Sequence, residues 1–251
     1  MSLLIEVCVD SVESALAAQA GGADRIELCL ALAEGGLTPS TGLLQEVRRR
    51  VSLPITVMIR PRPADFCYSP EDFAVMRQDL LAAKELGADG VVLGLLQPNG
   101  AIDLDRTREL IRLAHPLPVT FHRAFDLTRN AAEALEQLVE LRVTRLLTSG
   151  QAPNAEAGLD TLTQLVGQAG DRLIVMPGGG IREDNVAAIL RQSRAREFHV
   201  SASVTQTSTM TFRNPGVSMG QATAGAEYEW KVASADRVRA FRERARAISE
   251  S

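Results

Sequence analysis

Lysine is almost missing from this 251-residue chain: among its 27 lysines and arginines, only Lys84 and Lys231 are lysines. The first falls in a predicted helix and the second near the C-terminal segment. No lysine therefore stands at the end of a predicted strand, where its amine could form a Schiff base with a carbonyl substrate. This absence argues against a Schiff-base aldolase.

Other features are missing as well. No apolar run approaches the roughly 20 residues that a membrane-spanning helix needs, and the N-terminus enters a strand without the charged region of a signal peptide. The net charge is −4 and the arginines are dispersed, apart from residues 48–50 and the last segment, so a basic patch for nucleic acid is lacking. Three cysteines without an export signal favour free thiols in a reducing compartment. We expect a cytoplasmic protein that binds neither membranes nor nucleic acids.

What the sequence does contain is a regular alternation of strands and helices. The apolar runs are nearly continuous, as expected of parallel strands that are covered on both sides. Strands are predicted at Leu3–Val9, Arg25–Cys29, Ile55–Arg60, Gly90–Gly94, Val119–His122, Arg145–Ser149, Leu173–Met176 and Glu197–Ser201. Amphipathic helices are predicted from a capping box at residues 10–13 to Gly21, and at Gly42–Val51, Pro70–Leu86, Leu104–Ala114, Ala131–Leu141, Gly158–Ala169, Glu183–Gln192 and Ala235–Ile248.

Eight such units predict a single-domain α/β protein, the (β/α)8 TIM barrel. A doubly wound open sheet is the alternative, but its first turn is usually rich in glycine, whereas residues 9–11 contain none. Residues 202–232 depart from the pattern. They form a predicted long loop between the eighth strand and the last helix, rich in Ser, Thr, Gly and Gln. A loop of this length is expected to be a lid or disordered.

The first two strands carry the pattern Glu-x-Cys twice, as Glu6 and Cys8 and again as Glu27 and Cys29. Because side chains alternate along a strand, both members of each pair face the same side. If the strands are neighbours, two carboxylates and two thiols converge on one small volume. Buried glutamates are rare unless they are paired, and thiols are soft metal ligands.

Further polar residues collect at the other strand ends, where TIM barrels build their active sites. Arginine binds carboxylate or phosphate through two parallel hydrogen bonds, and a buried carboxylate and imidazole can serve as general base and acid. The candidate catalytic residues are Glu27, Arg60, His122, Arg123 and Asp126; the candidate anion-binding residues are Arg62, Gly178, Gly179, Gly180 and Ser201; the candidate metal ligands are Cys8 and Cys29.

The acidic residues also have structural explanations. Asp10 is expected to cap the first helix. Glu6 and Glu27 could instead be core carboxylates in ion pairs with Arg60 or Arg123.

The same holds for the cysteines and the glycine run. Cys8 or Cys29 could be a small buried apolar residue, Cys67 is expected to pack beneath its loop, and His199 could face either side of its strand. The run Pro177–Gly180 could present backbone N–H groups to a phosphate, or be a tight turn that needs positive φ.

Several motifs resemble the CutC family of copper homeostasis proteins, in order from the first strand to about Met219. They are Glu-Val-Cys at 6–8, Gly-Gly-Leu-Thr-Pro-Ser at 35–40, Ile-Arg-Pro-Arg at 59–62, Asp-Phe-Cys-Tyr at 65–68, Val-Thr-Phe-His-Arg-Ala-Phe-Asp at 119–126, Leu-Thr-Ser-Gly at 147–150 and Pro-Gly-Gly-Gly-Ile at 177–181. The resemblance implies a cytoplasmic TIM barrel, usually a homodimer or larger, that is linked to copper handling. A cuprous site proposed in that family on two cysteines falls on Cys8 and Cys29.

Two functions follow as hypotheses. The first is Cu(I) binding through thiols, because Cu(I) prefers thiolate and thioether ligands; nearby carboxylates would raise the thiol pKa values until a cation binds. The second is an enzyme, an isomerase, lyase or hydrolase, that acts on a small phosphorylated or carboxylate metabolite at the same face. No organic cofactor is indicated. A purely structural module would not predict such a ring of polar residues.

Overall fold

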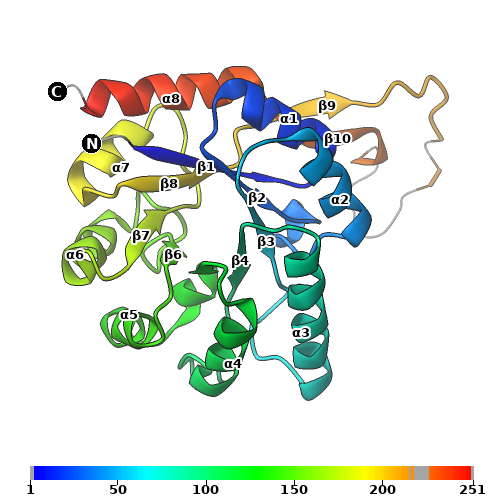
Figure 1. Ribbon diagram of the computed structural model, residues 1–251. Coiled ribbons are helices and arrows are strands. Elements are labelled where there is room, and N and C mark those ends of the chain that lie inside the picture. The colour runs from blue at the N-terminus through cyan, green and yellow to red at the C-terminus, as the bar shows by residue number, and fades with distance from the viewer. Residues whose placement is uncertain (1–2, 215, 218–225, 250–251) are drawn as a thin grey trace.

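The computed structural model describes residues 3–214, 216–217 and 226–249, and its centre is a ring of eight parallel strands surrounded by helices (Figure 1). The ring strands are β1 (Leu4–Val9), β2 (Arg25–Leu28), β3 (Ile55–Met58), β4 (Gly90–Leu93), β5 (Val119–Phe121), β6 (Arg145–Thr148), β7 (Ile174–Pro177) and β8 (Glu197–Val200). The helices are α1 (Val12–Gly21), α2 (Thr41–Arg50), α3 (Pro70–Glu85), α4 (Leu104–Ala114), α5 (Ala131–Glu140), α6 (Leu159–Ala169), α7 (Val186–Ser193) and α8 (Ala235–Ser249), with short 3-10 turns η1 (Leu32–Glu34), η2 (Arg123–Leu127) and η3 (Ala226–Tyr228).

Strands that are consecutive in sequence are neighbours in the ring, from β1 to β7, and β8 pairs with β1. β7 packs against β8 and completes the circle. The predicted single-domain TIM barrel is therefore confirmed. The apolar strands form it because helices cover their outer face: every residue of β2, β3 and β4 is buried. None of the described helices is both long and apolar enough to span a bilayer.

Helix ends follow local chemistry, with one correction. Ser69 and Asp72 form a reciprocal capping box at the start of α3. Asp10 does not cap α1, contrary to the prediction. The cap is Ser11, whose hydroxyl accepts a hydrogen bond from the Ser14 amide at 3.1 Å. The N-cap of α1 therefore lies one residue later in the chain than the capping box at residues 10–13 predicts.

The segment predicted as a long loop contains an antiparallel hairpin. The two strands of this hairpin are β9 (Ser203–Thr207) and β10 (Glu229–Ala233), which pair residue by residue. The Ser- and Thr-rich composition hid these strands, although Val204, Thr205 and Val232 are β-formers. Residues 215 and 218–225, also part of the predicted lid or disordered segment, lie outside the described residues.

Candidate functional site

The register of the barrel brings the two Glu-x-Cys strands side by side. Glu6 pairs with Arg25 and with His199, and Cys8 pairs with Glu27. The Arg25 side chain crosses the barrel interior to reach residues of β7 and β8. Since alternate residues of a barrel strand point inward, Glu6, Cys8, Glu27 and Cys29 all share this interior face, as the sequence pattern predicts.

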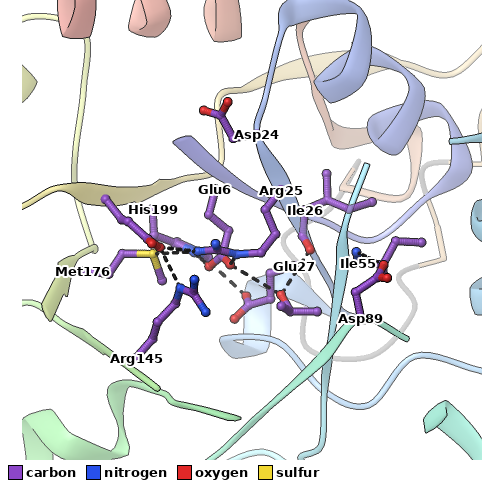
Figure 2. Close-up of polar contacts among 12 residues, drawn as sticks. Glu6, Asp24, Arg25, Ile26, Glu27, Ile55, Asp89, Arg145, Met176 and His199 are labelled. Atoms are coloured by element: carbon purple, nitrogen blue, oxygen red, sulfur yellow. Dashed lines mark hydrogen bonds and ion pairs between the residues drawn. The ribbon is translucent and has the colours of Figure 1, made fainter. Parts of the chain in front are cut away.

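An ion network that the sequence analysis missed fills the barrel below the carboxyl end (Figure 2). Arg25 Nε donates to Glu6 Oε2 at 2.5 Å and Arg25 Nη2 to Glu197 Oε2 at 2.7 Å, while Arg145 Nε reaches the same Glu197 oxygen at 2.8 Å. The predicted pairing of Glu6 with Arg60 or Arg123 is therefore wrong. A signal existed in the spacing, because Arg25 and Glu197 each precede an inward-facing site residue, Glu27 and His199, by two positions.

His199 faces the interior and lies between the two glutamates. Its Nδ1 is 2.8 Å from Glu6 Oε1 and its Nε2 is 3.8 Å from Glu27 Oε2. Burial opposes protonation of the ring, but the negative charges of Glu27 and Cys8 and the hydrogen bond with Glu6 raise the pKa of His199 well above its usual value. The imidazole is therefore held as a cation.

The two glutamates have opposite electrostatic characters. Burial raises the pKa of Glu6, but the hydrogen bond with His199 and the charge of Arg25 outweigh burial and lower it to about 2. For Glu27, burial and the charge of Glu6 raise the pKa despite the opposing effect of His199. Glu6 is thus a fixed anion, whereas the raised pKa of Glu27 makes it the more readily protonated of the two carboxylates.

A cavity of about 490 Å³ opens at the carboxyl end of the barrel. Residues from five of the eight strands, β1, β2, β3, β6 and β8, and from segments that follow the strands line it. The predicted site residues among them are Cys8, Glu27, Arg60, His122, Arg123, Gly179, Gly180 and Ser201. The structure therefore brings eight of the twelve candidates to one cavity, within the size range of small-molecule sites.

His122 and Arg60 form one wall of this cavity, on either side of Phe66. The His122 ring lies 4.9 Å from the Phe66 centroid, and the Arg60 guanidinium carbon lies 5.1 Å from the same centroid. Within the described residues Arg60 forms no ion pair with a glutamate: its Nη1 donates to the carbonyls of Glu34 and Gly36. Burial and the nearby charge of Arg60 lower the pKa of His122 to about 3, so this imidazole is neutral.

Arg123 and the glycine turn form a more exposed part of the cavity lining. Arg123 Nε donates to Asp126 Oδ2 at 2.7 Å and Nη2 donates to Ser149 Oγ at 2.9 Å. Nη1 lies 3.0 Å from the position that a side chain on Gly179 would occupy. Gly179 and Gly180 have φ of 90° and 70°, values that only glycine adopts without strain.

The remaining candidates serve the loops. Asp126 accepts bonds from Thr148 and from the backbone of Ser149, so it organises the rim and is not among the residues that line the cavity. Arg62 is paired with Asp65 and Asp72 and also lies off the cavity, which removes it from the anion site.

The two candidate thiols differ in access. Cys8 lines the cavity, whereas Cys29 is fully buried, with its sulfur 3.2 Å from the position of a Gly36 side chain. Cys29 packs with Met58 and Val92 in a small apolar cluster. Burial and the adjacent Glu27 carboxylate, 3.3 Å from the sulfur, raise the pKa of the Cys29 thiol well above its usual value. The sequence analysis missed Met58, the third sulfur of this region.

A second cavity of about 700 Å³ adjoins the first. The two share Cys8, Leu32 and Ser201, and the second extends to β10, including Trp230. Ser201 therefore stands at the boundary between the barrel mouth and the hairpin.

The interior also offers a hard donor set. Atoms of Glu6, Glu27 and His199 lie within 4.8 Å of one another, close enough to hold one metal ion. Two carboxylates and an imidazole suit Zn²⁺ or Fe²⁺ better than Cu(I). His199 would have to lose its proton first, and Glu6 is already neutralised by Arg25.

Comparison with known proteins agrees with the motifs. The CutC family model matches residues 3–204. The human copper homeostasis protein cutC homolog is 51% identical over 94% of this chain and 86% of its own length, and a CutC family protein of Chromobacterium violaceum is 48% identical over 97% and 98%. The crystal structure of CutC from Streptococcus agalactiae superposes with a TM-score of 0.76 at 32% identity, covering 79% of this chain and 98% of that one. Phosphoribosylanthranilate isomerase from Thermotoga maritima, at 14% identity and a TM-score of 0.58, shares the fold alone.

Proposed function

The chain belongs to the CutC family, and we propose that it acts in copper homeostasis by binding Cu(I) between Cys8 and Cys29 inside the barrel. The observation that carries this proposal is the placement of both thiols on the inner face of adjacent strands, with the Met58 thioether packed against Cys29. Thiolates and thioethers are the ligands that Cu(I) prefers.

The stagger of the two cysteines suits a bridging ion better than a disulfide. Cys8 is level with Glu27, so Cys29 lies two residues further along the neighbouring strand. A strand spacing of about 4.8 Å and a rise of about 3.3 Å per residue place the two Cα atoms about 8 Å apart. A disulfide needs Cα atoms within about 7 Å. Two inward-pointing sulfurs can still reach a common ion.

The surroundings are suited to a cation. Without one, the Cys29 thiolate would stand beside Glu27 in a site with no exposure, which is why its pKa is raised. A bound cation reverses this penalty, because it neutralises the thiolate and the neighbouring carboxylate together. Cu(I) would supply that charge when bound, and Gly36 leaves the Cys29 sulfur room on that side.

An anaerobic competition titration against a Cu(I) chelator tests the proposal. We expect the double variant Cys8→Ser/Cys29→Ser to bind Cu(I) at least about 100-fold more weakly, since even residues that only support metal ligands contribute about 10- to 100-fold. Cys67→Ser, which removes the third thiol outside the cavity, is the matched control and should leave affinity unchanged. Equal affinity in wild type and the double variant would refute the site.

A second function, catalysis on a small anionic metabolite, is favoured by a different observation. The same cavity combines the cations of Arg60 and Arg123 with the carboxyl group of Glu27 and the imidazole of His122. Cu(I) binding has no use for these arginines.

Thermal-shift measurements with inorganic phosphate, 2-phosphoglycolate and oxalate test this second function. Ligands that bind only the folded state raise its melting temperature. We expect stabilisation that is reduced in Arg123→Gln and retained in Arg172→Gln. Arg172 is a surface arginine that follows α6 and pairs with Glu136. If none of the three anions stabilises the wild type, the second function fails while the copper proposal stands.

A further inference from the structure

Resting on this second function, we infer that the cavity removes a proton from the carbon next to a carbonyl group in a small phosphorylated hydroxy-aldehyde or hydroxy-ketone. Glu27 is the base, and His122 is the hydrogen-bond donor to the carbonyl oxygen. The inference names the reaction class and substrate class of the site.

Two of the residues that line this cavity each carry a buried polar atom without a partner. Within the described part of the chain, Glu27 Oε1 and His122 Nε2 have no hydrogen-bond partner, and both residues are at most 4% exposed. Leaving a buried polar atom unsatisfied costs about 1–3 kcal/mol. A ligand that satisfies both atoms must therefore offer a hydrogen to the carboxylate oxygen of Glu27 and an acceptor oxygen to Nε2 of His122.

The hydrogen bonding of His122 fixes which atom it offers. The amide of Ala124 donates to His122 Nδ1 at 3.1 Å, so Nδ1 is the acceptor nitrogen. In a neutral imidazole the proton then resides on Nε2, the unpartnered atom. His122 consequently carries an unpartnered N–H donor in a residue that lines the cavity, and the charge of the Arg60 guanidinium acts on the ring. A neutral donor next to a fixed cation is suited to stabilise negative charge that develops on an oxygen.

Glu27 is held for the complementary task. Its Oε2 is occupied by the Cys29 thiol, with His199 Nε2 at 3.8 Å, while Oε1 remains available. A carboxylate with one oxygen anchored and the other free has a defined direction in which to take a proton. Glu6 cannot share this task, because Arg25 and His199 occupy its two oxygens.

The chemical step follows from these two groups. Glu27 Oε1 takes the proton as the C–H bond breaks, its electron pair forms the C=C bond, and the carbonyl π electrons move to the oxygen facing His122. When the carboxyl proton of Glu27 exchanges with solvent, its return to the same carbon replaces that hydrogen with a solvent one. Delivery of the proton to the neighbouring carbon moves the carbonyl group, as the hydroxyl proton of the first carbon passes to the oxygen facing His122. No oxidant, reductant or second substrate is needed.

The rim selects the substrate class. Arg123, held by Asp126 and Ser149, lines the cavity and lies against Gly179. Within the described residues, the amides of Gly179 and Gly180 donate to no acceptor. A guanidinium beside free backbone N–H groups fits a phosphate, and the volume of about 490 Å³ admits a short sugar phosphate.

Proton exchange in D2O, followed by ¹H NMR, tests the inference. The probes are dihydroxyacetone phosphate, ribulose 5-phosphate and fructose 6-phosphate. All samples contain a Cu(I) chelator, and each probe is compared with an enzyme-free sample. We expect loss of the proton signal next to the carbonyl for at least one probe. Glu27→Gln should slow it at least about 100-fold, and His122→Phe about 100- to 1,000-fold.

Matched variants separate chemistry from folding. His122→Gln, which retains a donor, should recover part of the rate, and Glu109→Gln on the surface of α4 should leave it unchanged. Exchange that is equally fast in Glu27→Gln overturns the assignment of the base. Binding of 2-phosphoglycolate without exchange of any probe overturns the reaction class but leaves the anion site standing. Absence of both overturns the second function as well.

Discussion

His199 Nδ1 lies 2.8 Å from Glu6 Oε1 inside the barrel, and the other oxygen of Glu6 is bound by Arg25. This relationship joins the ion network of the barrel floor to the cavity above it. His199 and Arg25 together lower the pKa of Glu6, while Glu27 and Cys8, with the hydrogen bond to Glu6, raise the pKa of His199. Glu6 and Arg25, which do not line the cavity, therefore influence the charges of the residues that do.

Glu6→Gln should lower the pKa of His199 toward its ordinary value, because the substitution removes a hydrogen-bonded negative charge from the ring. NMR titration of the imidazole measures this, with the signal assigned through His199→Gln. Glu46→Gln, which removes a carboxylate that contacts Arg49 and Arg50 at the surface, is the control and should leave the titration unchanged. An unchanged pKa in Glu6→Gln would show that the contact does not govern the ring.

The same substitution should change how stability depends on pH. The pKa of Glu6 is lowered from 4.5 to about 2 by folding, so its contribution is present above pH 4.5 and is lost as the pH falls toward 2. The raised pKa of His199 acts in the other direction: its contribution is present below pH 6.5 and is lost as the pH rises through the folded value.

We therefore expect Glu6→Gln to lower the free energy of unfolding at pH 7 by about 3–5 kcal/mol, since it leaves Arg25 and His199 without their shared anion. The loss of stability between pH 4.5 and 2 should be shallower than in the wild type. Urea unfolding at a series of pH values measures both effects, and parallel pH profiles for the two proteins would contradict the prediction.

Copper affinity should rise with pH. The Cys29 thiol is protonated at neutral pH because burial and Glu27 raise its pKa, so Cu(I) must displace a proton to bind it. The apparent affinity should increase about tenfold per pH unit for that proton. Competition titrations between pH 6 and 8 measure the slope of the logarithm of the apparent affinity against pH. This slope should fall by about one in Cys29→Ser. A wild-type affinity that does not change with pH would count against Cys29 as a ligand.

Two glycine substitutions should have opposite effects. Gly179→Ala forces a side chain into positive φ and to within 3.0 Å of Arg123, so we expect a loss of about 1–3 kcal/mol and weaker binding of phosphate. Gly167→Ala, within α6 and with no atom in its way, should stabilise by about 0.5–1 kcal/mol. Thermal unfolding with and without phosphate tests both; equal phosphate stabilisation in wild type and Gly179→Ala would exclude the turn from the anion site.

The sequence contained more of the site than its local motifs suggested. Inward-facing positions repeat every second residue along a strand. The inward orientation of Arg25 could therefore have been predicted from that of Glu27, and the orientation of Glu197 from that of His199. The pairing of Arg25 with Glu6 could not, because it depends on which strands are neighbours and in which register. Arg60 and Arg62 illustrate the same limit: both follow one strand, but the carbonyl of Glu34, 26 residues earlier, binds Arg60, whereas Asp65 and Asp72 bind Arg62.

By itself, the sequence determined the barrel, the family and the inward orientation of the Glu-x-Cys pairs, because strand periodicity, helix amphipathicity and motif order are properties of neighbouring residues. Only the tertiary structure decided the charge states and access of those side chains. Cys8 is open to the cavity and Cys29 is sealed under Gly36, while Glu6 is a fixed anion and Glu27 can exchange a proton. The motifs are identical, and the differences arise because burial and neighbouring charges from other strands set each pKa and each accessible surface.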